Sequence, residues 1–354
     1  MAGTQSLSNC ILPSAAALLI AAACTTACTT DRSGIPATPS AADSAPAAVG
    51  AGPIAPLEHG TLFVSNEGDN TLSVVDAATD SVTGTVQTGD RPRGLAVSPD
   101  GKTVYVALGR DNAVGVVDVA TRTMTDKIPC GTDPEQVAVS PDGTTLFVSN
   151  EEIAMATAID VVSRKTIFTV PVGNEPEGVL VTPDGQKVYV TNESSSTVTV
   201  IDARTGKQRG EFPVGARPRF VVFARDGSKA VVTSEQGGSI TVVDLPRDVP
   251  LKTVPVGDST KPTGVALSHD GMTAYFANGR ANRVSIFSIA AMMVTDTVPV
   301  GQRPWGVALT SDGNVLYTAD GRSNQLSVVD VIHKRVVRTI KVGERPYGVA
   351  IVGG

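Results

Sequence analysis

The chain has 354 residues, of which 35 are acidic and 29 are basic, and a formal net charge of −6 at pH 7. This charge favours solubility, and the chain as a whole has no basic footprint for nucleic acid or an anionic membrane. A chain of this length can hold two domains, but a 42-residue repeat that runs from Leu62 to the C-terminus indicates one closed array.

Residues 1–28 are predicted to be an export leader. The apolar run Ala15–Cys24 is too short to cross a bilayer and has the length of a secretory hydrophobic region. Cys24 follows small residues and resembles the acceptor of a bacterial lipoprotein signal, although no Lys or Arg precedes the run and Ala21 stands where that signal usually has leucine. We expect a periplasmic or otherwise exported protein, and Cys24 is the candidate residue for a lipid anchor. Cleavage near Ala27 and a misassigned start codon are the alternatives.

Residues 29–58 are rich in Ala, Pro, Ser, Thr and Gly, which predicts a flexible tether ahead of a folded domain at 59–354. The cysteines suggest no disulfide framework, because Cys10, Cys24 and Cys28 precede the repeats. Cys130 is the one cysteine within the repeats and takes a place that other repeats give to valine, so we expect a small buried hydrophobe there.

The repeat is marked by a Gly-x-x-Pro frame. Its starts lie 42 residues apart except for one interval of 44, and the two extra residues fall between Gly257 and Pro262, where we expect a longer loop and unchanged strands. The seven frames begin at Gly89, Gly131, Gly173, Gly215, Gly257, Gly301 and Gly343.

One repeat, Arg91–Gly131, divides at its turn signals into four short strands. Pro99–Gly101 is a tight-turn sequence, and Asp118–Thr121 predicts the second outer turn. The β-branched run Thr103–Leu108 is apolar on both faces, so that strand needs a sheet packed against each side. Blades arranged radially meet that need.

The two ends of the array complete each other. The chain enters at Thr61–Asn66, which matches the second strand of the repeat, and Arg345–Val352 is a first strand without successors. The sequence therefore predicts an all-β, seven-bladed propeller of four-stranded antiparallel blades, whose first blade is closed by the C-terminal strand. A solenoid is the alternative.

The repeat resembles the YVTN β-propeller repeat, which is spelled out at Tyr189–Asn192 and accompanied by Ser-Pro-Asp-Gly turns at Ser98 and Ser140. Blade-specific stretches such as "DRPRGLAVSPDG" and "VGQRPWGVALTSDG" are similar to the propeller proteins associated with pyrroloquinoline quinone-dependent alcohol catabolism and transport. This resemblance implies seven repeats, an export signal and a role beside such a system. Ser288 departs from the repeat by replacing the Asp at the end of a blade, which puts one outer turn in doubt.

The residues on either side of each frame proline are expected around the mouth of the central channel. Two neighbouring blades are acidic there and the others are mainly basic. In ring order the pairs are Arg91/Arg93, Asp133/Glu135, Glu175/Glu177, Arg217/Arg219, Lys261/Thr263, Arg303/Trp305 and Arg345/Tyr347.

A second loop of each blade is expected on the same face. It adds Glu151, Glu152 and Glu193 to the acidic side, and Arg280 and Arg322 to the basic side. The planar fork of arginine suits carboxylates and phosphates, and Trp and Tyr offer flat apolar faces. The pattern predicts a small planar anion, such as a quinone cofactor or an aromatic acid, bound on the basic side. The alternatives are a solvated rim in which neighbouring charges neutralise one another, and a Trp305 that only packs on an adjacent loop.

Catalytic patterns are scarce. His59, His269 and His333 fall in the tether end and in outer turns, which argues against a histidine metal site or a Ser-His-Asp triad. The mouth carboxylates offer oxygen ligands for Ca²⁺, as in metal-dependent lactonase propellers, but we expect them at the rim rather than deep in the channel.

The sequence therefore predicts an exported, monomeric, non-catalytic binding or scaffold propeller without a resident cofactor or metal. Its ligand would be a small anion or a protein partner at the channel mouth. A lactonase-like hydrolase and a periplasmic nucleic-acid-binding propeller are the alternatives.

Overall fold

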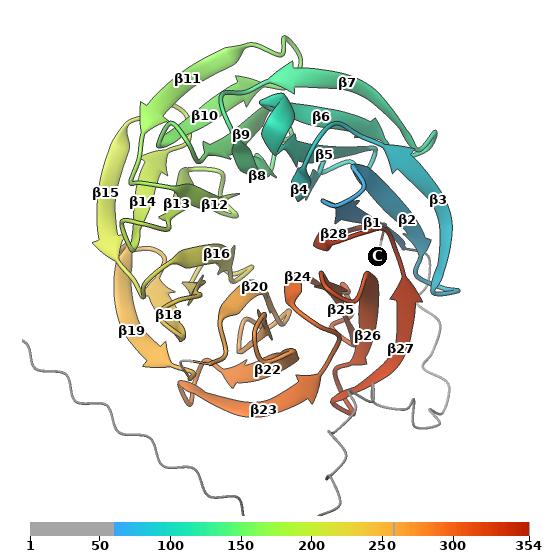
Figure 1. Cartoon of the computed structure of the whole chain (residues 1–354). Coiled ribbons are helices and arrows are strands. Elements are labelled where there is room, and N and C mark those ends of the chain that lie inside the picture. The colour runs from blue at the N-terminus through green and yellow to red at the C-terminus, as the bar shows by residue number, and fades with distance from the viewer. Residues whose placement is uncertain (1–59, 258, 354) are drawn as a thin grey trace, which may run out of the picture. The chain divides into compact units, whose positions relative to one another are not determined.

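The computed structural model describes residues 60–257 and 259–353. The leader, the tether, Cys24 and His59 lie outside this range. The described chain forms seven four-stranded antiparallel sheets, arranged radially as the blades of a ring (Figure 1). The predicted fold class is confirmed, and no helix among these residues is long and apolar enough to span a membrane.

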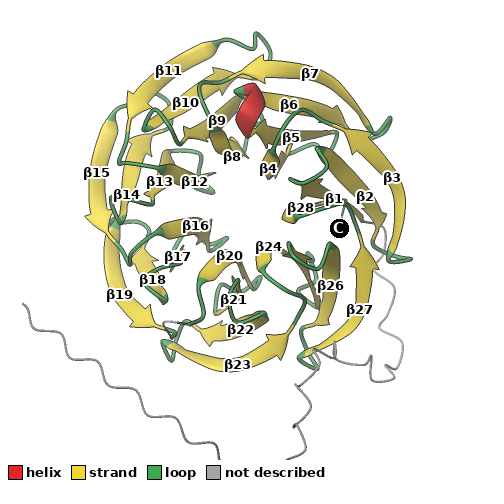
Figure 2. Ribbon diagram, in the orientation of Figure 1, coloured by secondary structure: helices red, strands yellow, loops and turns green. Residues whose placement is uncertain are grey.

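Each blade runs from an innermost strand at the channel to an outermost strand at the rim (Figure 2). The innermost strands are β28 (Pro346–Val352), β4 (Pro92–Val97), β8 (Pro134–Val139), β12 (Pro176–Val181), β16 (Pro218–Phe223), β20 (Pro262–Leu267) and β24 (Pro304–Leu309). The second strands are β1 (Thr61–Asn66), β5 (Thr103–Leu108), β9 (Thr145–Asn150), β13 (Lys187–Asn192), β17 (Lys229–Ser234), β21 (Thr273–Asn278) and β25 (Val315–Asp320).

The third strands are β2 (Thr71–Asp76), β6 (Ala113–Asp118), β10 (Met155–Asp160), β14 (Thr197–Asp202), β18 (Ser239–Asp244), β22 (Arg283–Ser288) and β26 (Gln325–Asp330). The outermost strands are β3 (Ser81–Gln87), β7 (Thr123–Pro129), β11 (Thr166–Pro171), β15 (Gln208–Pro213), β19 (Val249–Pro255), β23 (Met293–Pro299) and β27 (Arg335–Lys341). We number the blades from 1 (β28, β1, β2 and β3) to 7 (β24–β27). A single 3₁₀ turn, η1 (Gly109–Asp111), joins β5 to β6.

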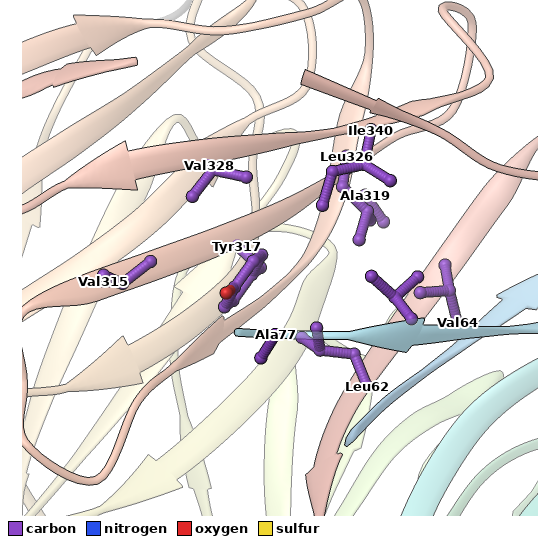
Figure 3. Packing of buried hydrophobic residues seen from close by; sticks show 10 residues of the cluster. Leu62, Val64, Ala77, Val315, Tyr317, Ala319, Leu326, Val328 and Ile340 are labelled. Atoms are coloured by element: carbon purple, nitrogen blue, oxygen red, sulfur yellow. The ribbon is translucent and has the colours of Figure 1, made fainter. Parts of the chain in front are cut away.

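The core lies between the blades, because the middle strands are apolar on both faces. Leu62 and Val64 of blade 1 pack against Tyr317 and Leu326 of blade 7 (Figure 3), and similar clusters fill the other blade interfaces. Burial of each such side chain contributes roughly 1.5–3 kcal/mol. This packing explains why the second strands have no polar face and the outermost strands do.

Blade 1 joins the two ends of the described chain. β1 pairs with β28 in antiparallel register, with Thr61 opposite Val352 and Phe63 opposite Ala350. The predicted closure by the C-terminal strand is confirmed.

The three irregularities of the repeat have local effects. The extra residues lie in the loop between Pro255 and Pro262, outside the strands. The Oγ of Ser288 accepts a hydrogen bond from the backbone N–H of Ala291 at 3.2 Å, so serine preserves the outer turn that Asp forms in other blades. Cys130 is buried, and burial raises the pKa of its thiol to about 12.

Candidate functional site

Every blade presents its frame residues on the same backbone scaffold. The residue before the proline has a left-handed conformation in all seven blades, with φ between 48° and 58°. Its carbonyl accepts a hydrogen bond from the second loop, as Arg91 does from Gly109 N–H at 3.0 Å and Glu175 does from Glu193 N–H at 2.8 Å. Non-glycine residues pay about 1–2 kcal/mol for this conformation. The two loops are therefore tied together in every blade, and apart from the longer loop before Pro262 the blades differ there in their side chains.

We expected both members of each pair at the rim, but the structure separates them. The residue before the proline is partly or fully exposed, whereas the residue after it begins the innermost strand and points inward. Arg93, Glu135, Glu177, Arg219 and Tyr347 are buried, and only Trp305 among the aromatic and charged members of this second group stays half-buried.

The buried side chains form a continuous network, which we call the ion-pair belt. One half lies on blades 2–4. Arg93 pairs with Glu135, and its Nη2 lies 3.5 Å from Glu177 Oε1. Arg91 Nη1 is 2.5 Å from Asp133 Oδ1, and its Nη2 is 3.0 Å from Glu135 Oε1.

The other half of the belt centres on Arg219. Its Nη1 contacts Glu193 and lies 3.0 Å from Glu177 Oε2, while its Nε donates to Glu235 Oε2 at 2.7 Å. Arg217 Nε lies 2.6 Å from Glu193 Oε2, and Arg303 Nη2 lies 3.0 Å from Glu235 Oε1. The belt thus comprises Arg91, Arg93, Asp133, Glu135, Glu177, Glu193, Arg217, Arg219, Glu235 and Arg303.

Burial and neighbouring charges separate the pKa values of the belt carboxyls. Burial alone would raise the pKa of Glu177, but Arg219, Arg93 and the Tyr347 hydroxyl outweigh it and hold the pKa at about 2. Burial and the charge of Glu177 raise the pKa of Glu193 to about 8, and the same two causes raise that of Glu135 well above its ordinary value. Neighbouring carboxyls therefore differ in protonation near neutral pH.

Aromatic rings form the channel wall next to the belt. The rings of Trp305 and Tyr347 lie 5.4 Å apart, and those of Phe220 and Tyr347 lie 6.4 Å apart. The Cζ atoms of Arg303 and Arg219 lie 4.4 and 5.3 Å from the centre of the Trp305 ring, within cation–π range. Tyr347 Oη donates to Glu177 Oε1 at 2.7 Å and so crosses from blade 1 to blade 4.

Blades 6 and 7 carry cations that the belt does not neutralise. Lys261, Arg280 and Arg322 have no carboxylate within 4.0 Å among residues 60–257 and 259–353. With Arg303 they form the basic sector. Its two loops are joined within each blade, where Gly279 N–H donates to Lys261 O and Arg322 N–H donates to Gln302 O, both at 3.0 Å. The two blades meet where Arg303 N–H donates to Asn282 Oδ1 at 2.9 Å. The half-buried Trp305 lies in this sector, with its indole against Gly321.

The remaining predicted site residues lie outside both groups. Arg345 is exposed, with its Nη2 3.5 Å from Glu67 Oε1. Glu175 is exposed and accepts a hydrogen bond from Ser194 Oγ at 2.6 Å. Together with Glu151 and Glu152 it forms an acidic sector on blades 3 and 4, on the same face as the basic sector.

Two features of the site went unpredicted. The sequence placed Glu193 on a second loop, but the pairing of Glu193 and Glu235 with Arg219 was not foreseen. Phe220 was missed entirely. It replaces the glycine that follows the frame in most repeats, and that departure was a usable signal.

Asp133, Glu135 and Glu151 do not fit a resident metal ion. One oxygen from each lies within 4.8 Å of the others, as a Ca²⁺ site requires. However, the guanidinium of Arg91 already contacts Asp133 and Glu135, so a cation would have to displace it. His269, beside Arg225, and His333, beside Asp330, lie in turns at the opposite end of the strands.

Similar solved structures share this architecture. Hydrazine synthase of Kuenenia stuttgartiensis has a TM-score of 0.69 at 24% identity, over 77% of this chain and 92% of that one. A protein of unknown function from Desulfotomaculum acetoxidans has a TM-score of 0.72 at 19% identity, over 82% and 98% of the two chains. A protein from Lactobacillus plantarum has a TM-score of 0.72 at 18% identity, over 84% and 100%. At these identities the likeness shows the fold alone.

Two sequence comparisons add to this. A PE-PGRS family protein of Mycobacterium tuberculosis is 50% identical over 40 residues, so the match spans 11% of this chain and 9% of that relative. The family described as "Lactonase, 7-bladed beta-propeller" matches residues 23–129 and 203–337, more than half of the chain. The seven blades agree with that description, and the protein therefore belongs to the lactonase seven-bladed β-propeller family.

Proposed function

We propose that this protein is a non-catalytic binding propeller that takes a small planar anion on its basic sector. One observation carries the proposal: Lys261, Arg280 and Arg322, on the mouth loops of blades 6 and 7 with the half-buried Trp305, have no carboxylate within 4.0 Å among residues 60–257 and 259–353. The frame arginines of blades 2 and 5, by contrast, are neutralised within the belt. Unpaired cations beside a half-buried aromatic ring are suited to a flat anionic ligand.

Arg303 would be the anchor of such a ligand. Its Nη2 is held by Glu235 while its guanidinium lies against the Trp305 ring, so its position is fixed before a ligand arrives. Fixing the side chain in advance lowers the entropy cost of binding. The anion would stack on Trp305 and receive hydrogen bonds from guanidinium groups of adjacent loops.

We further propose a biological setting from the blade-specific motifs. The protein would be exported, with a lipid anchor on Cys24, and would serve a pyrroloquinoline quinone-dependent alcohol oxidation or transport system. Pyrroloquinoline quinone is itself a planar polycarboxylate and matches the chemistry of the basic sector. A protein of that system with an acidic surface is the other occupant compatible with these charges.

The test is a calorimetric titration of the purified full chain with pyrroloquinoline quinone and with aromatic mono- and dicarboxylates. We expect micromolar binding that weakens about tenfold or more in an Arg280→Ala/Arg322→Ala double variant, and is unchanged in Glu152→Gln on the acidic sector. No heat with any of these ligands would overturn the proposal. Tighter, steeply salt-dependent binding of a DNA oligonucleotide would favour a nucleic-acid partner instead.

Lactone hydrolysis is a second candidate, favoured by the family and by the closeness of Asp133, Glu135 and Glu151. Hydrolysis that requires added Ca²⁺ or Mg²⁺ and disappears in Glu135→Gln would establish it. Because Arg91 occupies the position of the cation, we expect the wild type to show no such activity.

A further inference from the structure

We propose that an anion bound on the basic sector is coupled to proton uptake by Glu193, through the chain Arg303–Glu235–Arg219. The inference deepens the proposed function and rests on it for its ligand. The electrostatic link between Glu193 and Trp305, on which the coupling depends, can be tested without a ligand.

In the path Arg303–Glu235–Arg219–Glu193, each side chain contacts the next. Glu235 binds Arg303 through Oε1 at 3.0 Å and Arg219 through Oε2 at 2.7 Å. The Nη1 of Arg219 then contacts Glu193 directly. Arg219, Glu193 and Glu235 are all at most 5% exposed, so solvent and salt screen their mutual interactions weakly. A change of charge at Arg303 therefore changes the electrostatic potential at the Glu193 carboxyl.

The local balance of charges favours a shared proton. In the belt five carboxyls, those of Asp133, Glu135, Glu177, Glu193 and Glu235, face five guanidinium groups, those of Arg91, Arg93, Arg217, Arg219 and Arg303. An anion that binds Arg303 takes up part of one of those positive charges. The remaining four guanidinium groups then face five carboxyls, and protonation of one carboxyl restores the balance.

Glu193 is the carboxyl best placed to accept that proton. Its neighbours are Arg217 Nε at 2.6 Å, Arg219 Nη1, and Glu177, which shares the same Nη1. Its backbone N–H donates to Glu175 O, and Glu235 lies on the same two arginines. Glu177 is held ionised by Arg219, Arg93 and the Tyr347 hydroxyl, whereas burial and the charge of Glu177 raise the pKa of Glu193 to about 8.

The sign of the coupling follows from this order. Near and above pH 8 the free protein has lost part of the Glu193 proton, and a bound anion raises the pKa of that carboxyl further. Binding therefore takes up a proton, and by reciprocity the affinity falls as pH rises. We expect about a fivefold or larger loss of affinity between pH 7.5 and 9.

Trp305 is the only tryptophan of the chain and lies against both Arg303 and Arg219, so its fluorescence reports on the belt without a ligand. Between pH 6 and 9.5 we expect a transition near pH 8 in the wild type. It should be absent in Glu193→Gln and retained in Glu152→Gln. A wild type without this transition, or a Glu193→Gln protein that keeps it, would overturn the coupling.

The second experiment counts protons. Titration with pyrroloquinoline quinone at pH 8 in two buffers of different ionisation enthalpy should show proton uptake in the wild type and Glu152→Gln, and none in Glu193→Gln. Glu235→Gln, which interrupts the middle of the chain, should bind without uptake. Binding with no uptake by the wild type refutes the coupling alone. A wild type that binds no anion refutes the proposed function, and the fluorescence titration then still decides whether Glu193 and Trp305 are linked.

Discussion

The two sides of the channel mouth use the same scaffold for opposite purposes. On blades 2–5 arginines and carboxylates enter the channel and neutralise one another in the buried belt. On blades 6 and 7 the same positions carry Thr263 and Trp305, and Lys261, Arg280 and Arg322 have no carboxylate within 4.0 Å among the residues that the structure describes. The left-handed residue, the proline and the tied second loop recur on both sides, so the backbone fixes where side chains stand and leaves their chemistry free to differ.

The largest expected effect comes from breaking the belt side. Arg219→Met leaves Glu177, Glu193 and Glu235 buried without their shared cation, and we expect a loss of about 3–5 kcal/mol in the free energy of unfolding. Urea denaturation measures it. Arg322→Met, on the basic sector, should stay within about 0.5 kcal/mol of the wild type. Equal losses of unfolding free energy in the two variants would show that the belt stabilises the fold no more than the basic sector does.

Close backbone approach between blades should also matter on the basic side. A Cβ on Gly264 would lie 2.4 Å from the carbonyl oxygen of Trp305, so Gly264→Ala forces blades 6 and 7 apart. We expect a loss of about 1–3 kcal/mol, measured by the same denaturation. Gly210→Ala on β15, where nothing lies within 4 Å, is the matched control and should change stability by less than about 0.5 kcal/mol. A harmless Gly264→Ala would mean that these blades can separate freely.

A smaller effect concerns Asp320, a carboxyl buried beneath the basic sector. Burial raises its pKa from 3.8 to about 6, even though Ser327 and Thr318 donate hydrogen bonds to it. The folded protein thus holds this proton more tightly than the unfolded chain, and stability falls as pH rises from about 4 to 6. Asp320→Asn should therefore stabilise the protein by about 1–2 kcal/mol at pH 8 and by little at pH 4, as thermal unfolding at the two pH values would reveal. A gain that is equal at both values would contradict the assigned titration.

The fold could be predicted because the sequence repeats at a regular spacing. Strand order, blade number and the closure of blade 1 all follow from a repeat spacing and from the incomplete units at Thr61–Asn66 and Arg345–Val352. The positions of the mouth residues followed from the same spacing.

The depth and the pairing of those residues did not follow from the sequence. Whether the residue after a proline points along the rim or into the channel depends on the orientation of the innermost strand, which spacing leaves open. The hydrogen bond from Tyr347 to Glu177 joins blades three places apart, and it depends on the width of the channel rather than on any local pattern. The repeat therefore predicts where a residue lies in its blade, but not which residue its side chain contacts.

The sheet that unites β28 with β1 also sets the order of events during folding. Its two partners, Val352 and Thr61, lie at opposite ends of the repeats, so the entropy cost of this contact is the largest in the domain. While the chain is being synthesised, blades 2–7 can assemble one after another, but β1 keeps an unpaired edge until β28 emerges. In a chain truncated before Pro346, the edge of β1 would stay unpaired. We expect such a chain to aggregate or to be degraded by proteases rather than to persist as an open ring.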